Sequence, residues 1–294
     1  MFRFIIVFFF LAQAAFAVNS IEQEFTCPFD SNRWKQRMET SAEVKGVRLD
    51  LRQLGDVVQP PTLPQCPKCR AVLFMDNFPS EIVAALKPLV ATEDYAQLAS
   101  KYPSYYLLAQ MQEYLRPPHD KPEQLVARLY YVGHSYLRAS WQLENKPRAA
   151  KQCIDRAHEW FATALAEMGD SGKYFANTSL LLVELERRQG RFDVAGKRAR
   201  ILKNNDAFKE AGHQRIIERQ MDLIAKRDSE PHAIYAAHDS LIAAPVPSVR
   251  HTKPAPAHAT PLPRVDVMSP HSLESVSELA KPKPKPSKRT LSPQ

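Results

Sequence analysis

Apolar side chains recur at three- and four-residue intervals through much of residues 79–228. This spacing is typical of amphipathic helices with one buried face. The longest regular stripe comprises Ala150, Cys153, Ile154, Ala157, Trp160, Phe161, Ala164, Leu165 and Met168. Similar patterns predict helices over residues 80–90, 93–101, 104–115, 125–141, 174–189, 191–203 and 214–226, with Gly190 as a left-handed cap. The short connections favour antiparallel neighbours, so residues 79–240 are predicted to form one helical domain.

The chain before residue 79 lacks this helical period. Residues 24–30, 47–51 and 71–74 are short mixtures of apolar and polar side chains, and Pro60, Pro61 and Pro64 interrupt any helix between them. Short strands and loops are therefore expected here. We predict that residues 18–78 form a small N-terminal β module.

The first seventeen residues have the pattern of an export signal. Arg3 precedes an apolar run over residues 4–11, and Ala15-Phe16-Ala17 provides the small residues that signal peptidase requires before Val18. The run is too short for a standard transmembrane helix. We expect cleavage after residue 17 and a periplasmic or secreted mature protein without a transmembrane span, with an uncleaved N-terminal tether as the alternative.

The chain changes composition near its C-terminus. From Leu241 onward it contains 11 of its 24 prolines, and eight basic residues against three acidic ones. Residues 241–294 are therefore predicted to be a disordered, extended Pro/Lys-rich tail, with at most a brief helical turn at 272–280. The tail contributes +5 to the net charge of +8 and Arg3 contributes +1, which leaves +2 for residues 18–240. The positive charge of the tail would allow it to bind an anionic polymer of the cell envelope. Nucleic-acid binding is not expected, because the protein is predicted to be exported and residues 18–240 are nearly neutral.

Three of the four cysteines occur in two similar motifs. Cys66-Pro67-Lys68-Cys69 has the spacing of a zinc knuckle, and Cys27-Pro28-Phe29-Asp30 repeats it with Asp30 in place of the second cysteine. A zinc site formed by Cys27, Asp30, Cys66 and Cys69 is one hypothesis. The missing fourth cysteine favours a second hypothesis, in which two of Cys27, Cys66 and Cys69 form a disulfide in an oxidising compartment. Free thiols are the third alternative.

The sequence offers little evidence for catalysis. A Cys-x-x-Cys pair also occurs in thiol–disulfide oxidoreductases, where the first thiolate lies at the start of a helix, but residues 71–74 after Cys69 look like a strand. No nucleophile elbow, paired-carboxylate motif, HExxH or phosphate-binding loop is present. We therefore expect a protein that is not an enzyme, with thiol–disulfide exchange as the alternative. Cys153, on an apolar stripe, is expected to be a core residue.

Residues 180–195 resemble the hairpin of a tetratricopeptide repeat, with Gly190 at the turn and Phe192 and Ala195 after it. A weaker copy includes Gly133, Tyr136 and Ala150. Together with the two cysteine motifs and residues 74–78, these features resemble a bacterial family of unknown function that joins an N-terminal zinc ribbon to a tetratricopeptide-like helical domain. Family members usually have four knuckle cysteines and a glycine after the second knuckle, so this chain departs at Asp30 and Arg70.

The resemblance covers residues 24–228 and implies a mainly α fold. That fold is an antiparallel helical-hairpin bundle with a small zinc-ribbon-like β module and a disordered tail. Stacked hairpins form grooves that hold a peptide or a partner helix. We therefore expect a non-catalytic protein–protein interaction or scaffold protein of the bacterial periplasm. Four tyrosines either line the groove or pack in the core: Tyr105, Tyr106, Tyr130 and Tyr131.

Overall fold

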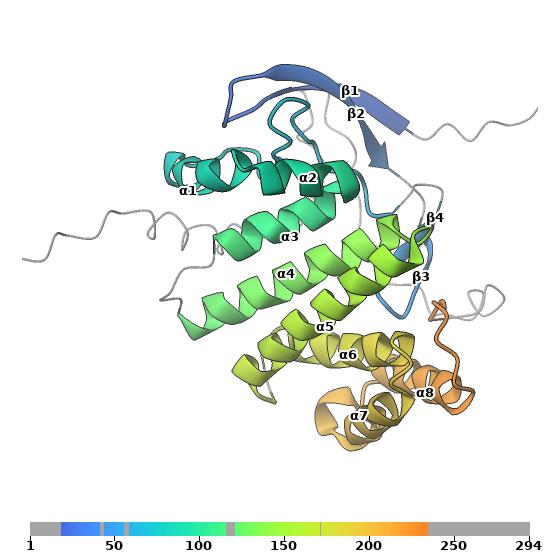
Figure 1. Cartoon of the computed structure of the whole chain (residues 1–294). Helices are drawn as coiled ribbons and strands as arrows, with labels where there is room; N and C mark the ends of the chain where they lie inside the picture. The colour runs from blue at the N-terminus through green and yellow to red at the C-terminus, as the bar shows by residue number, and fades with distance from the viewer. Residues whose placement is uncertain (1–18, 42–43, 56–58, 116–120, 171, 235–294) are drawn as a thin grey trace, which may run out of the picture.

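A computed structural model of the chain is mainly helical, with a small β module at its N-terminal end (Figure 1). It describes residues 19–41, 44–55, 59–115, 121–170 and 172–234. The expected signal segment, residues 1–17, and the expected tail, residues 241–294, lie outside this range.

Eight α-helices occupy the described part of the predicted helical region: α1 (Ser80–Val90), α2 (Glu93–Lys101), α3 (Ser104–Tyr114), α4 (Pro122–Gln142), α5 (Pro147–Met168), α6 (Phe175–Arg188), α7 (Phe192–Asn204) and α8 (Ala211–Ala225). The predicted helices lie within about three residues of these bounds, because proline and glycine mark many of the ends. Gly190, for example, has φ +75° after α6. A short 3-10 helix, η1 (Asp206–Phe208), was not predicted.

The helices pack largely in chain order. In Figure 1, α4 and α5 lie between α1–α3 on one side and α6–α8 on the other. One hydrophobic core joins the N-terminal module to α1–α3, a second lies among α4, α5 and α6, and a third lies among α6, α7 and α8. Tyr105 and Tyr130 are buried in these cores and Tyr106 and Tyr131 are half-buried against them, so the core interpretation of the four tyrosines is confirmed.

Gly133 allows α4 and α5 to approach closely. A Cβ at this position would lie 2.9 Å from Cε1 of Phe161 on α5, closer than two nonbonded carbons can pack. We predict that Gly133→Ala lowers the free energy of unfolding by about 1–3 kcal/mol, because overpacking outweighs the gain in helix propensity. Urea denaturation measures this. Gly212→Ala on α8 is the control, since its Cβ would meet nothing closer than 3.9 Å; equal stability of the two variants would contradict the prediction.

Two antiparallel strand pairs form the β module. The strands β1 (Asn19–Thr26) and β2 (Arg33–Ser41) form a hairpin, and β3 (Val44–Val47) pairs with β4 (Gln53–Gly55). The predicted strand positions were only partly right. Residues 71–74 contribute a single bridge, from Val72 to Gln65, and β2 was not predicted. The reason is composition, since Trp34 and Met38 are the only large apolar side chains of β2 and its other residues are charged or polar.

The segment after α8 returns to the β module. The Leu49 N–H donates to the carbonyl of His232 at 2.9 Å, and the Ile234 N–H donates to the carbonyl of Val47 at 2.8 Å. The C-terminal end of the described chain therefore pairs beside β3, far away in sequence. This closure joins the module directly to the last helical segment.

A buried carboxylate, Asp50, ties the same part of the module to the helices. Its side chain is 0% exposed and accepts hydrogen bonds from Arg48 (2.7 and 3.1 Å), from Trp141 Nε1 on α4 (3.0 Å) and from Arg188 on α6 (3.1 Å). Two guanidinium groups and an indole N–H thus share one acceptor residue, and Arg48 also pairs with Glu144. Charge pairing of this kind offsets the desolvation of each buried ion.

A second buried pair holds the closing segment. The fully buried Arg187 guanidinium binds the Glu184 carboxylate at 2.7 Å and donates to the carbonyls of Asp228 and Glu230. Burial raises the pKa of Glu184 to about 7, although the Arg187 charge opposes the shift. The Arg187 side chain therefore holds the main chain after α8 against α6.

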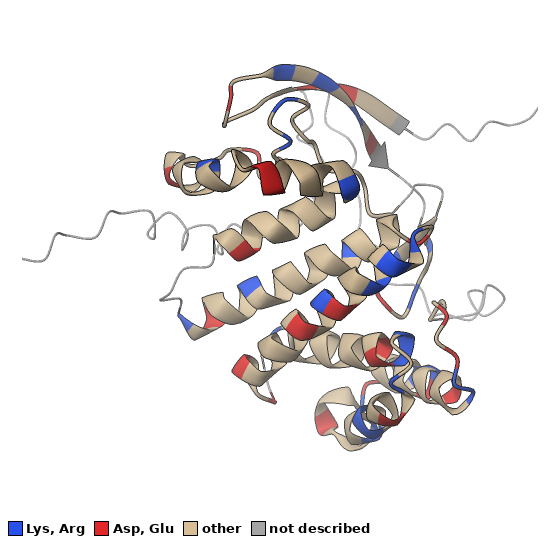
Figure 2. Cartoon of the chain, in the orientation of Figure 1, with Lys and Arg blue, Asp and Glu red and all other residues tan. Residues whose placement is uncertain are grey.

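Acidic and basic residues are intermixed over the helices in Figure 2, without an extended block of one sign in this view. This distribution fits the small net charge of residues 18–240. Within the described ranges, no helix has both the length and the apolar character needed to cross a membrane.

Candidate metal centre

Two turns of the same hydrogen-bonding pattern carry the cysteine motifs. They comprise residues 27–32, between β1 and β2, and residues 66–71. In each turn the N–H of the first residue donates to the carbonyl of the sixth, and the N–H of the fifth donates to the carbonyl of the first, at 2.8–2.9 Å. The two motifs that looked alike in sequence therefore adopt the same local structure.

The fifth residue of each turn has a left-handed backbone. Ser31 has φ +58° and Arg70 has φ +66°. Glycine adopts this conformation with the least strain. Both turns keep the conformation without glycine.

The turns bring together all four predicted metal ligands. One donor atom from each of Cys27, Asp30, Cys66 and Cys69 lies within 4.8 Å of every other. The Sγ atoms of Cys27 and Cys69 are 3.4 Å apart, and Cys66 Sγ lies 3.6 Å from Asp30 Oδ2. In a tetrahedral zinc site the ligand atoms are separated by about 3.5–3.8 Å. Two of the separations are thus close to those of a zinc site, and all four side chains are near enough together to hold one ion. Soft thiolate ligands suit zinc.

The disulfide hypothesis requires a rearrangement of this cluster. All three cysteines are free thiols in the structure. A disulfide has an S–S distance of about 2.0 Å, so the Cys27 and Cys69 sulfurs, at 3.4 Å, would have to move closer. The observed spacing resembles that of two ligands on one ion more than that of a bonded pair.

The cluster is largely enclosed. Cys27 and Cys66 are buried, whereas Asp30 and Cys69 are half-buried. Burial raises the pKa of the Cys27 thiol above its ordinary value and that of Cys69 to about 11. Burial also raises the pKa of Asp30, but hydrogen bonds from the Asn32 N–H and the thiols outweigh it and hold this pKa below its usual value. Metal binding deprotonates thiols, so binding here would release protons.

Two supporting residues were not predicted from the sequence. The Asn32 N–H donates to Asp30 Oδ1 at 3.0 Å, and its side-chain amide lies 3.9 Å from Cys66 Sγ in the other turn. From α2, the Tyr95 hydroxyl donates to the Arg70 carbonyl at 3.4 Å. Such groups orient ligands in metal sites. A polar residue after a knuckle is a weak sequence signal, and nothing in the sequence points to Tyr95.

Neither Cys66 nor Cys69 has the helix N-terminus at which thiol–disulfide oxidoreductases place their first thiolate. Residues 71–79 contain no helix, and α1 begins only at Ser80, so neither thiol lies at a helix N-terminus. Cys153 is fully buried in the core, as predicted, and burial raises its pKa to about 12. It takes no part in the cluster.

Fold and site together define a class: a mainly helical protein whose N-terminal β module contains a cluster of three thiols and a carboxylate. No family model matches the chain, and neither the curated proteins nor the solved structures contain a match to it. The residues and their geometry are thus the basis for a functional assignment.

Proposed function

We propose that this chain is an exported, non-catalytic interaction or scaffold protein of the bacterial periplasm, with a structural zinc ion in its N-terminal module. One observation carries the structural role of the site. The four donors of Cys27, Asp30, Cys66 and Cys69 face one another across two matching turns. Four protein ligands fill a tetrahedral zinc and leave no position for a substrate.

The position of the cluster supports a structural role. Cys27 and Cys66 belong to the same hydrophobic core as Leu86 and Leu107 of the helices. An ion that joins the two turns would therefore also fix the β module against α1–α3. This arrangement supports a zinc-ribbon-like module that stabilises a helical binding domain.

The helical part supports the interaction role. The turn between α6 and α7 has Gly190 with positive φ, and Ala195 is fully buried against the hairpin. These are the features expected of tetratricopeptide-like hairpins, whose stacked helices present grooves to peptides. The cationic segment from Leu241 onward would serve as a spacer or bind an anionic envelope polymer.

A crosslinking pull-down from periplasm tests the interaction role. The full chain and a chain that ends at residue 240 are each used as bait, with an unrelated exported protein as the control. The proposal requires at least one specific protein partner with the full chain. Recovery of no specific protein with either bait would refute it.

Asp30 offers a direct test of the metal ligands. We predict that Asp30→Cys restores a four-thiolate site and raises zinc affinity by about tenfold or more, because thiolates are softer ligands than carboxylates. Competition with a chromophoric chelator measures the affinity. Asp76→Cys is the control, since Asp76 is in the same module but outside the cluster. An affinity unchanged by Asp30→Cys and equal to that of the control would remove Asp30 from the site.

A second function is thiol–disulfide exchange through Cys66 and Cys69, which are free thiols in one turn. It predicts turnover in an insulin-reduction assay. Loss of that turnover in Cys66→Ser but not in Cys153→Ser would establish the redox function in place of a structural zinc site.

A further inference from the structure

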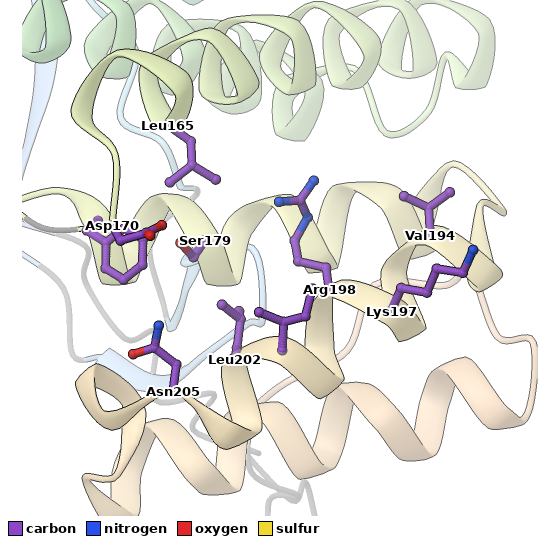
Figure 3. A pocket seen from close by; sticks show the side chains of 10 residues that line it. Leu165, Asp170, Ser179, Val194, Lys197, Arg198, Leu202 and Asn205 are labelled. Atoms are coloured by element: carbon purple, nitrogen blue, oxygen red, sulfur yellow. The ribbon is translucent and has the colours of Figure 1, made fainter.

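A hollow of about 280 Å³ opens on the helical body between α5, α6 and α7, away from the metal cluster. In Figure 3, Leu165 reaches it from α5, Ser179 from α6, and Val194, Lys197 and Leu202 from α7. Its walls are mainly apolar, with charged groups at the rim. It is therefore suited to a partner that offers both apolar and charged side chains.

Part of the apolar lining is exposed. Ile201 is 66% exposed and Val194 is 39% exposed, seven residues apart on the same face of α7. Ile201 is the most exposed of the large apolar side chains in the described part of the chain. Apolar side chains beside a hollow mark an interaction site more often than isolated ones do.

The floor of the hollow contains a polar group without a partner. Ser179 is 1% exposed, and its hydroxyl forms no hydrogen bond within the described residues. A buried hydroxyl left without a partner is unfavourable. A ligand that enters the hollow can supply that hydrogen bond.

The hollow is lined by charged residues of both signs: Lys197 and Arg198 of α7, and Asp170 before α6. Arg198 is paired with Glu186 at 2.8 Å, but Lys197 forms no ion pair with any described residue. Lys197 thus remains available for a carboxylate of the partner.

The chain itself contains a segment with the complementary pattern. Residues 271–281 are the only proline-free stretch longer than six residues from Leu241 to the end of the chain. They contain two of the three acidic residues of this region, Glu274 and Glu278, four residues apart. Leu273, Val276 and Leu279 recur every three residues, which would place them together on one face of a short helix. Such a helix would be apolar on one side and acidic beside it.

We propose that residues 271–281 dock in this hollow as a short amphipathic helix. The apolar side chains of the segment cover Val194 and Ile201, and one of its carboxylates pairs with Lys197. The docked segment would compete with external partners for the same surface. This inference extends the proposed interaction function, because it assigns an intramolecular occupant to a binding surface.

The intervening chain is long enough. Ile234 is the last described residue, and the 36 residues before His271 can extend to about 120 Å. A folded body of this size has a radius of gyration of only about 17 Å. Because the segment belongs to the same chain, its effective concentration at the hollow exceeds that of a separate molecule. Weak intrinsic affinity is therefore sufficient for docking.

Zero-length carbodiimide crosslinking of the full chain tests the proposal, because it joins a lysine amine to a carboxylate in direct contact. Peptide mass spectrometry is expected to find Lys197 linked to Glu274 or Glu278 within one chain, with a yield independent of protein concentration. Leu273→Ser/Leu279→Ser and Ile201→Asp should each lower this yield by about fivefold or more. Ile21→Asp, at an exposed apolar position on β1, is the control and should leave it unchanged.

Three results would overturn the proposal. The first is a yield of the Lys197 crosslink that neither set of substitutions lowers. The second is a link found only between isotopically distinct chains, which would assign the hollow to a second copy. The third is the absence of the link between Lys197 and either glutamate. If Ile201→Asp then abolishes capture of a periplasmic partner, the proposed interaction function stands although the docking proposal fails, so the two failures are distinguishable.

Discussion

Cys66→Ser is expected to abolish zinc binding and to destabilise the protein by about 3 kcal/mol or more. Structural zinc contributes its binding free energy to folding, which reaches about 10–16 kcal/mol in zinc-finger peptides. Metal analysis should find about one zinc per wild-type chain and none in the variant. Thermal denaturation should show a large fall in Tm, with the β module and α1–α3 affected first because they share a core with the cluster.

Cys153→Ser is the matched control for this variant. Cys153 and Cys66 are both fully buried thiols, so each substitution places a hydroxyl in an apolar site. Only Cys66 belongs to the cluster. A chelator should therefore destabilise the wild type and Cys153→Ser but leave Cys66→Ser unchanged. Equal zinc content and an equal loss of stability in the two variants would refute a metal centre at Cys66.

Asp50→Ala is expected to lower the free energy of unfolding by about 3–5 kcal/mol, the usual loss when one member of a buried ion pair is removed. The substitution leaves Arg48, Arg188 and the Trp141 N–H without their shared acceptor. Urea denaturation measures the loss. The Leu49 and Ile234 amides should also exchange their hydrogens faster, because their hydrogen bonds join the segment after α8 to the β module.

Asp222→Ala provides the comparison at the surface. Asp222 pairs with Arg219 and Lys226 on α8, but its side chain is 45% exposed. Exposed ion pairs contribute about 0–1 kcal/mol, so this variant should be nearly as stable as the wild type. If Asp50→Ala were no more destabilising than Asp222→Ala, the buried network would not hold the module to the helices.

The helices could be predicted because their signals are local. The stripe from Ala150 to Met168 and the glycine after α6 act within a few residues of the atoms that they position. The strand β2 had only a weak signal, an alternation of charged residues with Trp34, Gln36 and Met38, because most of its side chains are polar and its hydrogen bonds come from β1. A strand was predicted over residues 71–74, but only Val72 forms a bridge. An apolar run does not show whether a partner strand is present.

The candidate ligands could also be named from sequence. Each knuckle is a local turn, and its spacing determines which side chains project together, so Cys27, Asp30, Cys66 and Cys69 were identified before their positions were known. The groups that support them, Asn32 and Tyr95, were not identified. Their contacts join different turns or different elements, and no local spacing encodes such contacts.

The sequence by itself therefore determined the helical class, most helix bounds and the identity of the four candidate ligands, all of which follow from periodicity and spacing within short segments. The tertiary structure alone decided that the two turns meet, that Asp50 is buried under Arg48, Arg188 and Trp141, and that the end of the described chain pairs beside β3. The physical reason is that desolvation and packing depend on residues far apart in the chain. Whether a charge is buried with partners or exposed to water is set only when those residues come together.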